Sequence, residues 1–175
     1  MYRIALARRA DLVLLPGIEL AAARLLTGHA PESVLAEATS EADLHRAWRD
    51  AHLWVAIAND RPVGFALVKV LEARVAHLHE LDVHPDHGRR GLGRRLVEAV
   101  CAWAMRAQFE SVTLSTFRDV PWNMPFYERA GFDVVPSNAL SPALASIVDD
   151  EARRGLDMHR RVVMRRVLAT ERVSA

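Results

Sequence analysis

Apolar residues occur along the chain in short runs whose spacing switches between the two-residue period of strands and the 3.6-residue period of helices. Residues 53–58 and 63–71 are apolar runs separated by Asn59-Asp60-Arg61-Pro62, so they predict a hairpin. Residues 76–83 follow as a third strand of the same meander. Further strands are predicted at 2–7, 111–117, 132–135 and 160–168, and helices at 11–26, 31–51, 92–107 and 125–130, with a partly helical stretch at 137–156.

The strand at 76–83 leads through a short turn into the longest predicted apolar-striped helix. Pro85 ends the strand, because proline has no backbone N–H to donate to a ladder. From Leu92 the apolar residues follow a helical period. Strict alternation predicts different residues on the two faces of the strand: His77, His79, Leu81 and Val83 on one, and Leu78, Glu80 and Asp82 on the other.

The turn between this strand and helix has the composition of an anion-binding site. Glycines let the backbone approach a ligand closely, and the first N–H groups of a helix face negative charge. A Walker loop is excluded because no Gly-Lys-Ser/Thr precedes the helix, and a dinucleotide fingerprint because Leu96 stands where its third glycine would be. A tight connection with a solvated arginine cluster is the alternative interpretation. The candidate residues are Gly88, Arg89, Arg90, Gly91, Leu92, Gly93 and Arg94.

These residues resemble the core motif of the GNAT superfamily of acyl-CoA-dependent N-acyltransferases. That motif is Arg/Gln-x-x-Gly-x-Gly/Ala after a strand ending Val-x-Pro, and Val83-His84-Pro85, Gly91 and Gly93 match it, whereas Gly88 occupies the Arg/Gln position. Residues 126–132, Phe-Tyr-Glu-Arg-Ala-Gly-Phe, resemble the second GNAT signature, Tyr-x-x-x-Gly-Phe. The resemblance implies a single GNAT domain over residues 1–175, with an α/β fold. Its sheet would be mixed, mostly antiparallel and splayed, with six to seven strands and helices on both faces; a generic α/β sandwich is the alternative.

The resemblance also implies acetyl-CoA as the acyl donor, with the pyrophosphate of coenzyme A held by the amides at the helix start. Arg89 or Arg90 would then replace the side chain missing at Gly88. Many relatives carry an asparagine seven residues before the signature tyrosine, where this chain has Val120, so Asn123 is a candidate substitute. The cofactor contacts implied are Leu81, Val83, residues 88–94, Asn123 and Phe126.

Four side chains are candidates for the chemistry. His77 and His79 are spaced as in the arylalkylamine N-acetyltransferase branch, where two such histidines relay a proton from the amine, and imidazole can accept that proton. Glu80 is a rival base. It ranks third, after the two histidines, because alternation puts it on the opposite face of the strand. Tyr127 occupies the position whose hydroxyl protonates the departing thiolate. The alternatives are structural: hydrogen-bonded strand histidines, and a core aromatic with a satisfied hydroxyl.

Composition narrows the class of protein. The 175 residues carry 23 Lys and Arg against 22 Asp and Glu, and 51% are apolar, which fits one globular domain and argues against strong nucleic-acid binding. No apolar run approaches the roughly 20 residues of a membrane span, and the N-terminus lacks a signal peptide's apolar core, so a cytoplasmic location is expected. Cys101 is the only cysteine. Metal is not expected, because His84 and His87, the partners that His77 and His79 would need, lie on a loop.

The sequence therefore predicts an acetyl-CoA-dependent N-acetyltransferase that acetylates a primary amine of a small molecule by direct attack. Neither nucleic acid nor membrane is expected as a partner, and homodimers are common among proteins that look like this one. Acetylation of a protein amine or an aminoacyl-tRNA, and a non-catalytic acyl-CoA sensor, are the alternatives.

Overall fold

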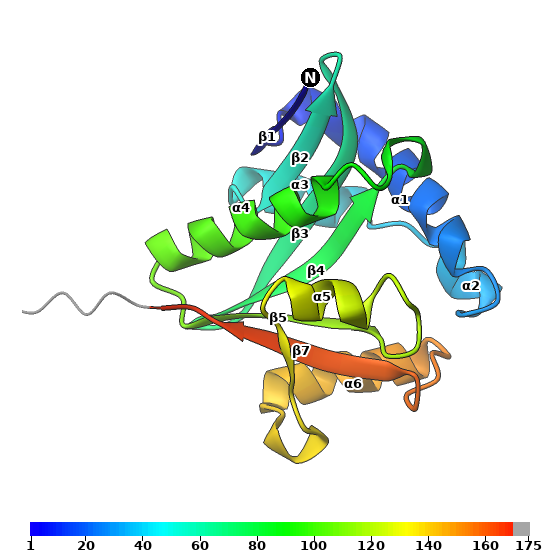
Figure 1. Ribbon diagram of the computed structural model, residues 1–175, viewed down its shortest axis with the longest axis vertical. Coiled ribbons are helices and arrows are strands. Elements are labelled where there is room, and N and C mark those ends of the chain that lie inside the picture. Colours follow the sequence, from blue (N-terminus) through cyan, green and yellow to red (C-terminus); the bar gives the residue numbers. More distant parts are fainter. Residues whose placement is uncertain (170–175) are drawn as a thin grey trace, which may run out of the picture.

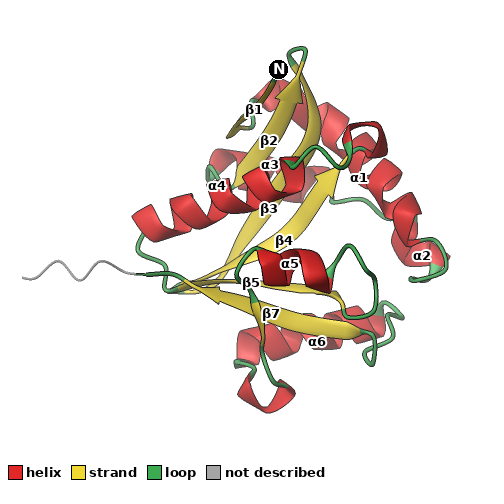
Figure 2. Ribbon diagram, in the orientation of Figure 1, coloured by secondary structure: helices red, strands yellow, loops and turns green. Residues whose placement is uncertain are grey.

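The computed structural model describes residues 1–169 and contains one seven-stranded sheet in the order β1-β2-β3-β4-β5-β7-β6 (Figures 1 and 2). Neighbouring strands are antiparallel except β4 and β5, which are parallel. This confirms the predicted mixed, mostly antiparallel sheet. The strands are β1 (Tyr2–Leu6), β2 (Leu53–Ala58), β3 (Arg61–Glu72), β4 (Val75–Val83), β5 (Ser111–Phe117), β6 (Asp133–Val134) and β7 (Arg161–Val167).

Helices cover both faces of the sheet, as predicted. On one face α4 packs through Leu96 and Val100 against buried strand residues such as Leu78, because its apolar stripe must be removed from water. On the other face α1 and α3 pack through Ile18 and Leu44 against β2 and β3. The helices are α1 (Leu15–Ala23), α2 (Glu32–Leu35), α3 (Glu41–Arg49), α4 (Leu92–Arg106), α5 (Met124–Arg129) and α6 (Pro142–Arg153).

Two of the predicted helices are interrupted. The helix expected at 11–26 is a short α1 between two 3-10 turns, Arg9–Leu14 and Arg24–Leu26. The helix expected at 31–51 divides into α2 and α3, because the Ser40 side chain accepts a hydrogen bond from the Asp43 N–H and caps α3. The chain from 24 to 40 therefore contains only two short helical elements, the 3-10 turn Arg24–Leu26 and α2.

Strands β4 and β5 pair at only three positions and then separate. Val75, Ala76 and His77 lie opposite Ser111, Val112 and Thr113, and no further pairing of β4 with β5 exists among the described residues. The remaining part of β4, from Leu78 to Val83, stays paired with β3 on its other edge. Figure 1 shows β4 running toward α1, whereas β5 continues beside β7, so that the two strands diverge.

A β-bulge interrupts β4 at His79. Leu67 of β3 lies opposite Glu80, and the next residue, Val68, lies opposite Leu78, so His79 has no partner in the register. An extra residue in one strand of an antiparallel pair reverses the faces of all residues beyond it.

The predicted alternation of β4 is therefore wrong beyond the bulge. Glu80 and Asp82 lie opposite Leu67 and Phe65, which pack with α1 and α3, so both carboxylates face those helices. His77 lies opposite Lys69, which pairs with Asp43 of α3, so it shares that face. Glu80 is thus on the same side of the sheet as His77. Leu81 and Val83 face α4 with Leu78.

Gly64 of β3 provides a test of this close strand packing. A Cβ at this position would lie 2.7 Å from the carbonyl oxygen of Asp82, whereas a Cβ at Gly17 in α1 would meet nothing within 4 Å. We expect Gly64→Ala to lower the free energy of unfolding by about 1–3 kcal/mol. Gly17→Ala should raise it by up to about 1 kcal/mol, because alanine favours helix. Urea denaturation measures both, and an equal effect of the two substitutions would contradict this packing.

Candidate active site

A cavity of about 740 Å³ opens where β4 and β5 separate. One wall comes from the exposed end of β4, and the opposite wall from residues 115–117 of β5 with Trp122, Asn123, Phe126 and Tyr127. The cavity reaches Gly88, Arg89 and Gly93 on one side of the sheet and the acidic residues near α1 and α6 on the other. It therefore connects the two faces of the sheet through the gap between the strands.

The predicted anion site is at one end of this cavity. The backbone N–H groups of residues 89–94 donate to no described residue, because they precede the first intrahelical bond, from the Arg95 N–H to the Gly91 oxygen. Gly91 has φ +73°, a left-handed conformation that glycine adopts without strain. Six consecutive N–H groups are thus free to bind an anion at the start of a fifteen-residue helix.

The arginines predicted to contact the cofactor from this loop differ in whether they line the cavity. Arg89 lines the cavity, whereas the guanidinium of Arg90 lies 5.8 Å from the Tyr2 ring centroid and Arg94 does not line the cavity. The Leu92 side chain is buried against the core, so only its N–H faces outward. Arg89, rather than Arg90, is therefore placed to substitute for the side chain missing at Gly88.

Two glycines keep the loop close to its neighbours. A Cβ at Gly93 would lie 3.5 Å from the Phe126 ring, and a Cβ at Gly88 would lie 3.1 Å from the Pro85 oxygen. A cradle of free N–H groups with one adjacent arginine has the chemistry that a pyrophosphate requires. The residues present therefore fit the diphosphate of coenzyme A, although Gly88 supplies no side-chain contact.

Tyr127 lies on the cavity wall opposite β4. Its ring packs edge-on against Phe126, at 4.9 Å between centroids, and against Phe132, at 5.8 Å. Burial raises the pKa of the phenol above its ordinary value, and the negative charges of Asp82 and Glu80 raise it further. The phenol is therefore protonated throughout the neutral range and able to donate a proton.

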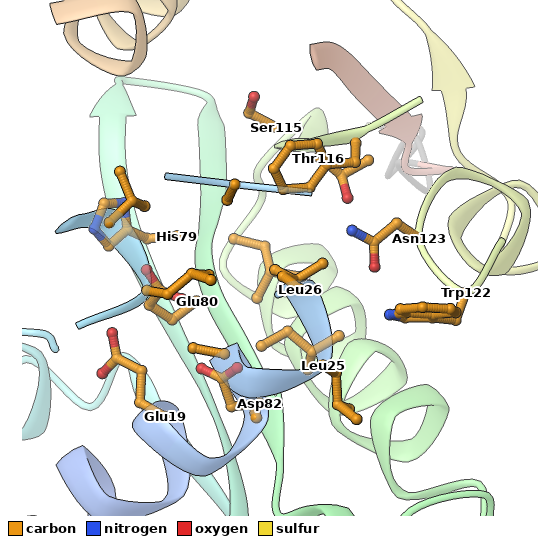
Figure 3. A pocket seen from close by; sticks show the side chains of 18 of the residues that line it. Glu19, Leu25, Leu26, His79, Glu80, Asp82, Ser115, Thr116, Trp122 and Asn123 are labelled. Atoms are coloured by element: carbon orange, nitrogen blue, oxygen red, sulfur yellow. The ribbon is translucent and has the colours of Figure 1, made fainter. Parts of the chain in front are cut away.

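Asn123 and Val120 differ in their access to the cavity. Asn123 precedes α5 and its amide faces the cavity (Figure 3). Val120 is fully buried with Phe117 and Leu156 and does not line the cavity. Of these two positions, Asn123 alone can contact a molecule bound there.

The two candidate histidines lie near each other but differ in environment. Their ring centroids are 6.3 Å apart. His77 is buried, and its Nδ1 lies 3.0 Å from the hydroxyl oxygen of Thr113. Burial lowers the pKa of both imidazoles and the positive charge of Lys69 adds to this effect, so that the pKa of His77 is about 4 and that of His79 is about 3. Both imidazoles are therefore neutral at pH 7 and weakly basic.

Three carboxylates gather beside the histidines, from β4 and α1 (Figure 3). Burial raises the pKa of Glu80 to about 8, with a further contribution from the negative charge of Glu19. The pKa of Asp82 is also raised by burial and by Glu80, and its Oδ2 is buried with no hydrogen-bond partner in residues 1–169. Glu19 accepts hydrogen bonds from the backbone N–H and the hydroxyl of Thr39, at 2.9 and 3.1 Å.

Alternation alone did not identify Glu19 or Asp82 as part of this cluster. Glu19 is the only charged residue of α1, whose sequence is Leu-Pro-Gly-Ile-Glu-Leu-Ala-Ala-Ala. A single carboxylate in an otherwise uncharged helix is the sequence signal that could have identified Glu19 as a candidate site residue. Asp82 is two residues from Glu80, so the strand period itself places the two carboxylates on one face. The bulge that turns them toward Glu19 has no comparable signature in the sequence.

Four of the other charged residues of the cavity form two ion pairs with one another. Arg161 donates two hydrogen bonds to Glu151, at 2.6 and 3.0 Å, and a third to the Ser115 hydroxyl. Arg154, which follows α6, donates to Glu37 at 2.8 Å. This second pair joins the segment between α2 and α3 to the end of α6. It lies on the side of the cavity that contains the acidic residues near α1 and α6.

No group of three His, Cys, Asp or Glu side chains in residues 1–169 is arranged to hold a metal ion. In the same part of the chain, no helix has the length and apolar character needed to cross a bilayer.

Comparisons with known proteins agree with this geometry. Mouse N-acetyltransferase family 8 member 7 is 29% identical over 102 residues, which is 54% of this chain and 45% of that protein, so the chain spans less than half of this curated relative. A GNAT-family acetyltransferase from Staphylococcus aureus has a TM-score of 0.72 at 16% identity and covers 97% of this chain and 100% of its own. Neisseria gonorrhoeae N-acetylglutamate synthase, solved with coenzyme A and N-acetylglutamate, has a TM-score of 0.70 at 19% identity and covers 97% of this chain and 35% of its own. The model of the acetyltransferase (GNAT) family matches residues 22–132, more than half of the chain, and the chain therefore belongs to that family.

Proposed function

We propose that the protein transfers an acetyl group from acetyl-CoA to a primary amine of a small molecule. The observation that carries this proposal is the cavity between β4 and β5, which joins the free N–H groups of residues 89–94 to Tyr127 and to the carboxylates near α1. A donor bound on one side of the sheet and an acceptor bound on the other would meet in this gap. Holding two reactants in this way supplies much of the rate enhancement of a bimolecular reaction.

The donor side has groups suited to acetyl-CoA. The N–H groups of residues 89–94 and the guanidinium of Arg89 would hold the diphosphate. Residues 78–83 have an edge with no β5 partner in the described chain, so backbone groups there are available to the rest of the donor and to the oxyanion formed at its carbonyl. The complex of coenzyme A with the gonococcal synthase, which shares the fold, supports this assignment.

Glu80 fits the role of general base better than either histidine. An alkylamine with a pKa near 10.4 must lose a proton before it attacks, at a cost of about 4.6 kcal/mol at pH 7. The best base has a pKa near the working pH, which describes Glu80 at about 8 rather than the histidines at about 3 and 4. The bulge at His79 is what brings Glu80 into the cavity. The likeness to the arylalkylamine branch, which rests on the histidine pair, stays a prediction.

Tyr127 is the candidate general acid. Its phenol stays protonated near pH 7, and a thiol with a pKa near 8.5 accepts a proton readily as the carbon–sulfur bond breaks. A covalent enzyme intermediate is not required. Cys101 is buried in α4 with its pKa raised to about 11, which makes it a poor nucleophile.

The shape of the acceptor side favours a small molecule over a protein. The ion pair between Glu37 and Arg154 crosses this side, and both residues line the cavity. Leu26, Ala30 and Val34 pack against Phe117 and Leu156, which attaches the segment around α2 to the far wall. An extended polypeptide would require these contacts to separate.

Calorimetric titration with acetyl-CoA and a thiol-release assay over a panel of alkyl- and arylalkylamines test the proposed function. We expect micromolar binding and amine-dependent release of coenzyme A. Absence of binding would contradict the donor site, and binding without turnover on any amine would favour the sensor alternative.

Replacing Tyr127 with phenylalanine removes only the hydroxyl. We expect Tyr127→Phe to lower kcat at least tenfold with little change in acetyl-CoA affinity, because the thiolate loses its proton donor. Tyr2→Phe is the matched control, since Tyr2 is the only other tyrosine and does not line the cavity. An unchanged kcat for Tyr127→Phe would remove the phenol from the mechanism.

The pH dependence of kcat/KM distinguishes Glu80 from the histidines. Glu80 accepts a proton only above its pKa of about 8, so kcat/KM should rise with pH to about 8 and then level off. In Glu80→Gln we expect kcat/KM to fall about a hundredfold at pH 8 and to keep rising toward the pKa of the acceptor amine, near 10.4.

His79→Ala is the control for this profile. Because the pKa of His79 lies near 3, its removal should leave the break near pH 8 in place. Loss of the break in His79→Ala, with its retention in Glu80→Gln, would assign the base to the histidine.

A further inference from the structure

The acceptor side of the cavity contains more carboxyl groups than it has cations to pair with them. Three cations approach Glu80 on this side of the sheet: Lys69, Arg154 and Arg161. Each already has its own carboxylate: Lys69 pairs with Asp43 at 3.9 Å, Arg154 with Glu37 at 2.8 Å, and Arg161 with Glu151 at 2.6 Å. Glu19, Glu80 and Asp82 therefore have no cation of their own in residues 1–169.

The carboxyl groups without a paired cation have fixed positions in the cavity wall and do not extend into solvent. Glu19 is buried, and Thr39 fixes its orientation through a backbone and a side-chain hydrogen bond. Asp82 has one oxygen, Oδ2, that is removed from solvent and has no hydrogen-bond partner in the described chain. A buried polar atom without a partner is costly, so its retention in a cavity wall indicates a donor supplied by a ligand.

Apolar side chains also line the cavity on the side of the acidic cluster. They suit a chain of methylene groups. Leu25 and Leu26 lie beside the carboxylates in Figure 3. The apolar residues used here are Leu25, Leu26, Val34, Leu35 and Ile147.

We propose that the acceptor is an aliphatic diamine, and that Glu19 and Asp82 bind its second, unreacting ammonium group. This inference rests on the proposed function. One ammonium gives a proton to Glu80, and its neutral nitrogen forms the bond to the acetyl carbon as the carbon–sulfur bond breaks and Tyr127 protonates the thiolate. The second proton lost by this nitrogen returns to the Tyr127 phenolate, and the proton on Glu80 passes to solvent. The reacting nitrogen then carries no positive charge, so a monoamine would leave Glu19 and Asp82 without a cation. A second ammonium keeps them compensated throughout the reaction.

Matched four-carbon ligands test the inference through binding. We expect calorimetry on the full chain at constant salt and pH 7.5 to give a Kd for 1,4-diaminobutane at least tenfold lower than that for butylamine. 4-Aminobutanol, whose second group is an uncharged hydroxyl, should resemble butylamine, and 4-aminobutanoate, whose second group is a carboxylate, should bind more weakly than the other three ligands. Equal affinities for the diamine and butylamine, or tighter binding of butylamine, would overturn the proposal.

Thiol release with the same ligands separates this inference from the proposed function. Selective binding of the diamine without release of coenzyme A by any amine would refute the transferase activity and leave the diamine site standing. Equal kcat/KM for diamine and monoamine, together with equal affinities, would refute the diamine site and leave the transferase activity standing.

Two substitutions locate the selectivity. We expect Glu19→Gln to reduce the preference for the diamine at least fivefold, with little change in the Kd of butylamine. Asp150→Asn is the matched control, because Asp150 lines the same cavity but is exposed and pairs with Arg153. A preference unchanged in Glu19→Gln, or reduced equally in both variants, would contradict the assignment to Glu19. The selectivity of the unaltered protein decides the proposal even if a variant folds poorly.

Discussion

The arrangement of the site depends on how strand β4 satisfies its two edges. On one edge it pairs with β3 along nearly its whole length, and on the other it pairs with β5 for only three residues. A strand whose second edge lacks a partner leaves backbone groups available, which a compact domain tolerates only where water or a ligand can reach them. The cavity lies at this edge, and both the donor loop and the acidic cluster are placed relative to it.

The bulge at His79 determines which side chains of β4 lie in the cavity at this edge. Without the extra residue, Glu80 and Asp82 would face the apolar underside of α4 and would have to be buried there. With it, they face Glu19 in the cavity, where mutual repulsion and burial raise the pKa values of both β4 carboxylates. The same irregularity therefore places a carboxyl with a pKa of about 8 in the cavity, with two further carboxyls, those of Asp82 and Glu19, beside it.

The sequence predicted the elements of the fold well because their signals are local. The apolar runs of β2 and β5 and the start of α4 at Leu92 were placed correctly, since each depends on residue period and neighbouring turn residues. The loop at 88–94 was identified from glycine and arginine content, and its free N–H groups follow from the helix start. The position of Tyr127 on the cavity wall agrees with the second motif, and Asn123, the candidate substitute at this wall, also lines the cavity.

What the sequence did not predict depends on contacts between distant residues. The single-residue shift between Leu67 and Val68 in the β3–β4 register is invisible in the alternating pattern of β4, and it reversed the predicted face of Glu80. The position of Glu19 beside Glu80 could not be predicted, because it depends on the packing of α1 against β4. The low pKa of His79 likewise follows from burial and from Lys69 on a neighbouring strand.

We propose that donor and acceptor meet in the gap between β4 and β5. A crystal structure of the protein with coenzyme A tests it most directly. We predict the diphosphate within hydrogen-bonding distance of the N–H groups of residues 89–94, and the sulfur between the two strands, in contact with the Tyr127 hydroxyl. Coenzyme A bound away from residues 89–94, or with its sulfur outside this gap, would contradict the account.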